Sequence, residues 1–431
     1  MRTQYVFTIK SPNFKQQLLL WSQQFEEVVW LDSNNHHQKY STYDVVLAID
    51  AFSCISTCYT GSFKQLEDYQ NKTKDWIFGY LTYDLKNDIE PLQSNQFDGL
   101  NFPELFFFQP KKIFLIKGDE VKMLYLNAVA DMFESDLSAI QQIKEKEEVI
   151  ISEKINIKLR LTKDQYLEKV NTMLAHIHRG DIYEANFCQE FFAENTQIDP
   201  FRIYQKLNAI SKAPFAAYFK NHHYYALSAS PERYLKKENQ IVISQPIKGT
   251  AKRSADKIID QELKSELKNN DKERSENIMI VDLVRNDLSH TAKKGSVHVE
   301  ELCEVYTFEQ VHQLISTITS LVEKETSAVS ILKSTFPMGS MTGAPKISAM
   351  KIIENLEETK RGLYSGAIGY FDPKGNFDFS VVIRSILYNS KNNYVSYSVG
   401  SAITAQSDPL KEYEECFIKA KAMQSVLENE I

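Results

Sequence analysis

Strand-like runs spread over both halves of the chain limit its possible folds more than any other feature of the sequence. Each run is rich in β-branched and aromatic residues, which favour pleated strands. The runs stand at residues 113–116 and 122–126, on either side of a Lys117-Gly118-Asp119 turn, and again at 224–227, 241–244, 377–383 and 394–399. Helical patterns lie between and after them. The chain is therefore predicted to be mixed α/β, and periodicity alone leaves its strand order open.

Two helices can be placed from local signals. Thr162 and Gln165 form a capping-box pattern, apolar residues follow at helical spacing, and Gly180 ends the helix. A last helix is expected to begin at Asp408-Pro409, because aspartate is a good N-cap and proline suits the first helical position. Its buried stripe is predicted to be Tyr413, Phe417 and Ala420.

A charged stretch at residues 141–148 is the main change of composition along the chain. It is typical of a solvated helix end or a connection. It separates a β-rich first part, residues 1–150, from a second part, residues 155–431. Of the 431 residues, 43% are hydrophobic and 25% are charged, which is ample material for a buried core.

Charge and hydropathy exclude several classes of function. A net charge of −7 gives no electrostatic footprint for nucleic acid or an anionic membrane. No apolar run approaches the roughly 20 residues of a membrane span, and the first six residues lack the features of a signal peptide. The five cysteines are scattered, so reduced thiols are expected. These observations predict a cytoplasmic protein with neither a nucleic-acid nor a membrane partner.

Two glutamate pairs have the same helical spacing. Glu273 and Glu276 are three residues apart, as are Glu412 and Glu415 in the last helix. Like charges at this spacing repel mildly, and a divalent cation between the two helices would turn the repulsion into ligation. Exposed glutamates explain the spacing equally simply, since Lys419 lies four residues after Glu415 as a favourable partner.

Lys248 stands in the stretch Pro246 to Arg253, directly after the strand-like run 241–244. A lysine there is neutral near physiological pH if burial or neighbouring cations lower its pKa. Only the neutral amine is a nucleophile or a base. A charged and solvated turn lysine is the alternative, and spacing alone favours it.

Several longer sequence motifs point to one family. The stretches 230–233, 246–253, 276–287, 339–346 and 364–370 resemble, in this order, the chorismate-utilising enzymes. That family includes anthranilate synthase component I, aminodeoxychorismate synthase component I, isochorismate synthase and salicylate synthase. Several long motifs that occur in the same order are far more specific than one short motif. The resemblance covers about residues 160–431 and is weak before them. It implies a large mixed fold, anthranilate synthase component I-like, with antiparallel sheets packed face to face and helices outside.

The same resemblance implies a site for magnesium and chorismate. Glu276 and Glu415 match the Mg²⁺ ligands, with Glu273 and Glu412 acting through water, and the metal would clamp a carboxylate of chorismate. Glu232 matches the general acid that protonates the leaving C4 hydroxyl, so burial should raise its pKa; a salt bridge with Arg233 is the alternative. The residues implied to bind the substrate are Thr250, Tyr364, Arg384, Lys419 and the backbone at Gly400 and Ser401, where a glycine lets amides approach an anion.

Lys248 selects among the family members. In aminodeoxychorismate synthases, a lysine in the motif that matches residues 246–253 is thought to add to C2 of chorismate. Ammonia then enters at C4 and expels the lysine. The expected product is 4-amino-4-deoxychorismate, for 4-aminobenzoate and folate, and the ammonia would come from a separate glutamine amidotransferase subunit. Glu184 replaces the lysine base of isochorismate and salicylate synthases and the glutamine of ammonia-using relatives. It is expected either to admit or orient ammonia or to be structural.

Gln313 is a second departure, because relatives carry a histidine there. His312 is not expected to substitute for it, since adjacent residues point in different directions. Anthranilate synthase component I remains the alternative function, with Lys248 against it, and a non-catalytic relative is a third reading that only Gln313 supports. A tryptophan site is not expected, because residues 213–215 match that site only in part.

Overall fold

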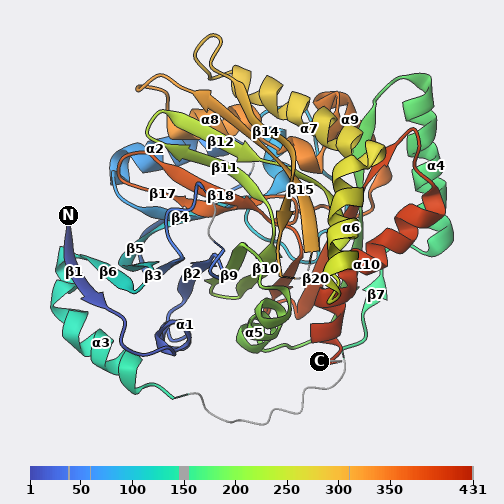
Figure 1. The fold of residues 1–431 in the computed structure, drawn as a ribbon. Coiled ribbons are helices and arrows are strands. Elements are labelled where there is room, and N and C mark those ends of the chain that lie inside the picture. The colour runs from blue at the N-terminus through green and yellow to red at the C-terminus, as the bar shows by residue number, and fades with distance from the viewer. Residues whose placement is uncertain (37–38, 59, 145–154, 310, 430–431) are drawn as a thin grey trace.

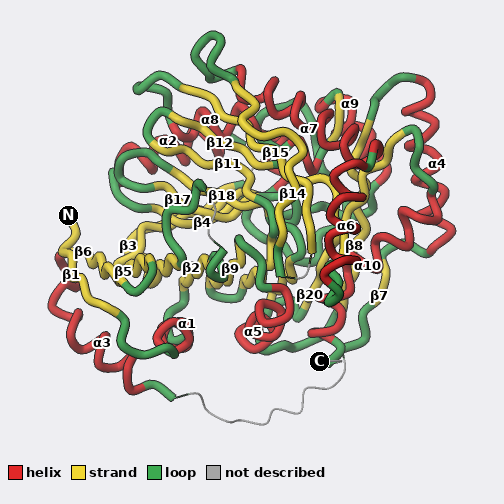
Figure 2. Tube along the Cα trace, in the orientation of Figure 1, coloured by secondary structure: helices red, strands yellow, loops and turns green. Residues whose placement is uncertain are grey.

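Antiparallel pairing links the strands into one network, which divides into two layers (Figures 1 and 2). The computed structural model describes residues 1–36, 39–58, 60–144, 155–309 and 311–429. The first layer runs, in order, through β1 (Arg2–Thr8), β6 (Glu120–Leu126), β5 (Leu105–Lys117), β3 (Val45–Thr57), β2 (Glu27–Asp32), β9 (Phe215–Asn221), β10 (Tyr224–Ser230), β19 (Ser385–Asn389), β20 (Tyr394–Thr404) and β8 (Glu184–Ala193), with β7 (Lys158–Leu159) and β16 (Gly343–Ala344) along β8.

The second layer leaves the first at β5, whose first half also pairs with β4. It runs through β4 (Ile77–Leu81), β17 (Ala367–Phe371), β18 (Phe377–Val381), β11 (Arg233–Glu238), β12 (Ile241–Gln245) and β15 (Val311–Leu321), with β13 (Ile247–Lys252) and β14 (His298–Thr307) both paired to β15. The strand-like runs of the sequence thus lie in strands of both layers.

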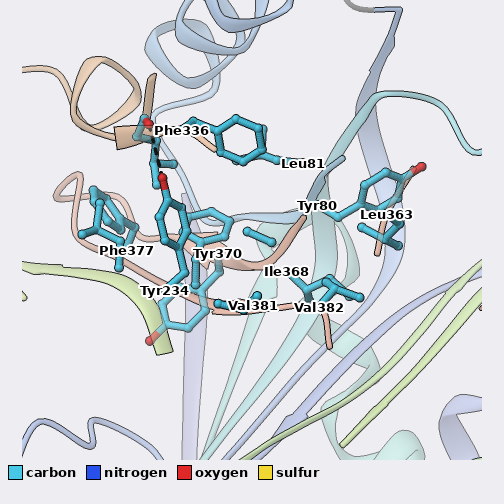
Figure 3. Packing of buried hydrophobic residues seen from close by; sticks show 14 of the residues in the cluster. Tyr80, Leu81, Tyr234, Phe336, Leu363, Ile368, Tyr370, Phe377, Val381 and Val382 are labelled. Carbon is cyan, nitrogen blue, oxygen red and sulfur yellow. Dashed lines mark hydrogen bonds between the residues drawn. The ribbon is translucent and has the colours of Figure 1, made fainter. Parts of the chain in front are cut away.

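Large aromatic side chains fill the space between the layers. Tyr80 of β4 packs edge-on against Phe219 of β9, with ring centroids 5.1 Å apart. Figure 3 shows part of the same cluster, in which Tyr80, Ile368 and Tyr370 lie among other buried side chains. Each fully buried large apolar side chain contributes about 1.5–3 kcal/mol. The predicted face-to-face packing of antiparallel sheets is confirmed.

Helices cover the outer faces, as predicted (Figure 1). On the first layer a second core joins the sheet to α1 (Phe14–Ser22), α3 (Phe133–Gln142), α4 (Lys163–Arg179), α5 (Pro200–Ser211), α9 (Lys346–Leu356) and α10 (Pro409–Leu427). Around the second layer lie α2 (Ser62–Thr73), α6 (Lys257–Asn269), α7 (Asp271–Ser289) and α8 (Ala328–Thr335). Short 3₁₀ turns are η1 (Tyr83–Asp88), η2 (Asn127–Met132) and η3 (Gly339–Met341). No helix in these described segments is long and apolar enough to cross a membrane.

The two predicted helix starts are confirmed. Thr162 and Gln165 form the capping box of α4, and Gly180 ends the helix at φ 89°. Asp408 caps α10, with a proline in its first turn. The predicted buried stripe of α10 is partly wrong. Ala420 is buried, but Tyr413 and Phe417 are only partly buried.

The buried face of α10 is displaced toward Glu412 and Cys416. Ser407 donates a hydrogen bond of 2.8 Å to Glu412, and this bond helps the carboxylate to lie inside.

Strands of the first 150 residues pair directly with strands of the second part. β2 pairs with β9 along six residues, and β4 pairs with β17 along five. The charged stretch 141–148 is described only as far as residue 144, just after α3 ends. The rest of it, and the predicted boundary at 150–155, lie largely outside the described residues.

Candidate active site

Lys248 lies in a pocket of carboxylates. It stands on β13, and its Nζ is 3.1 Å from Oε1 of Glu184, the first residue of β8. The lysine side chain is only 13% exposed and that of Glu184 only 2%. Burial lowers the pKa of Lys248, but the carboxylates of Glu184, Glu276 and Glu232 outweigh this and raise it above its usual value. Of the two conditions for a neutral amine, burial is met, but the charged groups beside Lys248 are carboxylates, which favour the charged form. In this arrangement Lys248 forms an ion pair with Glu184.

Glu232 is buried where β10 gives way to β11. Ser340 of η3 donates a hydrogen bond of 2.7 Å to its Oε1. Burial raises the pKa of Glu232 to about 7, although the bond from Ser340 and the charge of Lys248 act in the opposite direction. Arg233 does not form the alternative salt bridge, because it pairs with Asp378 at 3.0 Å. Glu232 can thus hold a proton near neutral pH, as a general acid must.

The four predicted metal residues lie on two helices, and one lysine lies between two of them. Glu273 and Glu276 are on α7, and Glu412 and Glu415 are on α10. The Nζ of Lys272 is 3.8 Å from a carboxylate oxygen of Glu276 and 3.8 Å from one of Glu412. These two glutamates, from two helices, therefore share one neighbouring cation.

The environments of these glutamates differ. Burial raises the pKa of Glu276 to about 7. Burial also raises the pKa of Glu412, despite the hydrogen bond from Ser407. For Glu415, burial acts upward, but Lys419 at 2.6 Å prevails and lowers the pKa. A divalent cation would favour the ionised form of all of them.

The donor set fits a hard divalent cation by type. All the donors are carboxylate oxygens, which Mg²⁺ prefers, and Oε1 of Glu276 is buried without a hydrogen-bond partner. Among the described residues, no three acidic, histidine or cysteine side chains are already arranged to hold a metal. Instead, Glu276 and Glu412 flank the ammonium group of Lys272.

Arg384, Lys419 and Gly400 form a connected group of the predicted substrate residues. Arg384 lies between β18 and β19, and its Nη1 donates to the carbonyl of Lys419 at 3.1 Å. The ammonium of Lys419 donates to the carbonyl of Gly400 at 2.8 Å. Burial lowers the pKa of Arg384, while Tyr364 and Glu415 counteract it. Tyr364 is itself buried, at 3% exposure. Two cationic residues therefore belong to one hydrogen-bonded group, in which the ammonium of Lys419 also pairs with Glu415 at 2.6 Å.

Close packing requires a glycine at position 400, and the sequence did not reveal this requirement. A Cβ at this position would lie 2.2 Å from Oδ1 of Asn186 and 2.9 Å from Sγ of Cys188. The glycine is required by the close approach of β8 and β20, whatever its backbone binds. Ser401 is fully buried, and its hydroxyl lies 3.5 Å from the carbonyl of Glu412. Its side chain therefore packs under α10.

The departure at Gln313 lies beside Thr250. The two residues are paired in register between β13 and β15. Gln313 is 6% exposed, and its side-chain oxygen is buried without a partner. His312 makes contacts elsewhere, since its Nε2 is 3.1 Å from Asp260. As expected, His312 does not take the place of Gln313.

Two neighbours of the site were missed by sequence reasoning. Ser340 lies within the stretch 339–346 that carries the resemblance, but its bond to Glu232 spans 108 positions. Lys272 stands four residues before Glu276, a spacing that predicts a helical ion pair. The helical spacing therefore indicated Lys272, whereas no neighbouring residue in the sequence indicates that Ser340 bonds to Glu232.

A surface hollow lies beside residues of β2, β9 and β11. Asp32, Ser33, Pro214, Phe215 and Arg233 are among its lining residues. It therefore includes two residues of the stretch 213–215 that partly matches a tryptophan site.

Comparison with known proteins shows the family of the chain. The family model described as chorismate binding enzyme matches residues 23–425. The chain belongs to that family. An anthranilate synthase component I-like protein of Synechocystis is 36% identical over 82% of this chain and 72% of its own length. Aminodeoxychorismate synthase component 1 of Bacillus subtilis is 30% identical over 87% of this chain and 81% of its own.

The Escherichia coli protein of that name is 40% identical over 62% of this chain and 58% of its own length. The chain thus spans less than two thirds of some of the relatives it matches. Among solved structures, anthranilate synthase component I of Streptococcus pneumoniae superposes with a TM-score of 0.77 at 25% identity, covering 90% of this chain and 93% of that one. The Escherichia coli menaquinone-specific isochorismate synthase gives 0.78 at 16% identity, covering 99% and 94%, and supports the fold alone.

Proposed function

We propose that this chain is component I of an aminodeoxychorismate synthase, which converts chorismate and ammonia to 4-amino-4-deoxychorismate and water. The observation that carries the proposal is the buried Lys248, paired with Glu184 and close enough to Glu232 to affect its pKa. The aminodeoxychorismate synthase names of several relatives support it. The product would serve the synthesis of 4-aminobenzoate and folate.

The cationic side chains and the four glutamates would bind the substrate. Arg384, with Tyr364, would receive the enolpyruvyl carboxylate, and Lys419 with Thr250 would assist at the ring carboxylate. Bound Mg²⁺, held by Glu276 and Glu415 directly and by the other two glutamates through water, would supply positive charge for that ring carboxylate. The dicarboxylate would thereby be fixed relative to Lys248 and Glu232.

The acid–base steps follow from the observed contacts. Glu184 takes a proton from the ammonium of Lys248 through the 3.1 Å contact, which frees the amine. The amine bonds to C2 of chorismate while the C4 hydroxyl leaves as water with the proton of Glu232. Ammonia then bonds to C4 and expels the lysine as an amine, and the surplus proton returns to a carboxylate. Oε2 of Glu184, buried without a partner, would accept an N–H of the incoming ammonia.

The first test identifies the product. The purified chain is incubated with chorismate, Mg²⁺ and ammonium, and the products are separated and analysed by mass spectrometry. An amino-chorismate that a lyase converts to 4-aminobenzoate is expected. Anthranilate would instead support the alternative, which the name of the Synechocystis relative favours. The absence of any product, with ammonium or with glutamine and an amidotransferase, would support a non-catalytic relative.

Lys248→Ala tests the covalent role. It should abolish product formation and leave chorismate binding intact, whereas Lys252→Ala, an exposed lysine of the same strand, should change neither. Unchanged turnover of Lys248→Ala would refute the covalent role.

Glu184→Gln tests the proton acceptor. Product formation should fall most at neutral pH and recover at alkaline pH, where solvent can deprotonate the lysine. An equal loss at every pH would contradict this role of Glu184.

The partner is proposed to be a separate glutamine amidotransferase subunit, in keeping with the "component 1" in the relatives' names. Adding that subunit should make glutamine a nitrogen source, measured as glutamine-dependent product.

A further inference from the structure

Lys272 lies among the four glutamates proposed to hold magnesium. It is in the first turn of α7, and its ammonium is 3.8 Å from Glu276 on the same helix and 3.8 Å from Glu412 on α10. A cation in the first turn of a helix is disfavoured by the helix dipole. The nearby carboxylates compensate for this unfavourable position.

Lys272 lies between carboxylates of the two helices without a close hydrogen bond to either. Its ammonium is equidistant from Glu276 of α7 and Glu412 of α10, at 3.8 Å from each. At 3.8 Å neither contact is a close hydrogen bond, and Oε1 of Glu276 keeps no partner. The lysine therefore neutralises the carboxylates without occupying their oxygens.

We propose that Lys272 is an internal counter-ion of the magnesium site, which the metal must displace, and that this competition sets the metal affinity. The side chain is 44% exposed, so it can move into solvent when the metal enters. The proposal rests on the metal part of the proposed function. It adds that the site's own lysine holds two glutamate-bearing helices together before the metal binds.

Substitution of Lys272 should therefore tighten metal binding. A unit positive charge about 8 Å from a divalent ion in water opposes binding enough for about a five-fold change in Kd. Lys272→Gln is expected to bind Mn²⁺ about five-fold more tightly, as measured by the electron paramagnetic resonance signal of free Mn²⁺, with Mg²⁺ as competitor. Lys272→Met provides a second neutral variant if the first does not fold.

Two controls separate charge from position. Lys272→Arg keeps the cation and should retain the wild-type affinity. Lys268→Gln removes an exposed lysine that pairs with Glu304 at 3.2 Å, and it should also leave the affinity unchanged. In EDTA the neutral variants should unfold at a lower temperature than Lys272→Arg, and saturating Mn²⁺ should remove that difference.

Equal or weaker Mn²⁺ binding by a folded Lys272→Gln or Lys272→Met would overturn the proposal. So would the absence of Mn²⁺ binding by every variant, which would also refute the metal part of the proposed function. Neither result decides the amino transfer chemistry, because the product assay tests that separately.

Discussion

Glu232 should make the protein less stable as the pH rises, and replacing it by a group that does not ionise should abolish this loss. Its pKa is raised to about 7 in the folded chain, from an ordinary value of 4.5. Between these two values the folded state binds more protons than the unfolded state, so the free energy of unfolding falls with rising pH. A shift of this size costs about 3 kcal/mol once the pH exceeds 7, at 1.36 kcal/mol per pKa unit.

Glu232→Gln replaces the buried acid by a neutral group of the same shape. The amide oxygen can still accept the hydrogen bond from Ser340. The variant should be more stable than the wild type by about 3 kcal/mol at pH 8 and by about 1 kcal/mol or less at pH 5. Urea unfolding at both pH values, followed by circular dichroism and by tryptophan fluorescence, gives the two differences.

Glu414→Gln, which neutralises an exposed glutamate of α10, serves as the control and should change stability little at either pH. The reasoning is refuted if Glu232→Gln gains nothing at pH 8. It is also refuted if the gain is the same at pH 5, because the effect would then not come from ionisation.

Three further predictions follow from other contacts. Ser340→Ala removes the hydrogen bond that stabilises the carboxylate of Glu232, so the pKa of this acid should rise. The alkaline limit of kcat/KM, corrected for the concentration of free ammonia, should therefore move up by about one to two pH units. An unchanged limit would disprove the role of this contact. Gly400→Ala would bring a methyl group within 2.2 Å of Asn186, and we expect a clear loss of Tm and of chorismate binding, measured by scanning calorimetry and titration. Lys86→Met leaves two carboxylates, each 3.0 Å from the buried ammonium, without their partner, and should cost about 3–5 kcal/mol in urea unfolding; a neutral effect would contradict this.

Local signals were sufficient for what depends on a few neighbouring residues. The ends of α4 and the start of α10 follow from caps within one turn, so Thr162, Gly180 and Asp408 could be read directly. The resemblance also named Lys248, Glu232 and Glu184, which lie near one another in the fold. The pairing of Lys248 with Glu184 joins the stretch 246–253 to a residue 64 positions away.

What could not be predicted depends on distant partners. Carboxylates from β8 and α7 raise the pKa of Lys248, and no spacing rule indicates which charges a fold brings beside a lysine. The burial of Glu412 needs the hydroxyl of Ser407 at the end of a turn, which displaced the buried face of α10 from the predicted stripe. The close approach at Gly400 likewise depends on Asn186 of another strand.

The interleaving of the sheet has a consequence for synthesis on the ribosome. β2 and β4 are made early, but the strands that complete them, β9 and β17, end at residues 221 and 371. Until those residues emerge, one edge of each early strand has its backbone hydrogen-bonding groups unpaired, which is the condition that favours aggregation. Folding of the N-terminal strands must therefore wait for most of the chain. Slow translation between β2 and β17 should lengthen the time during which the nascent protein depends on chaperones.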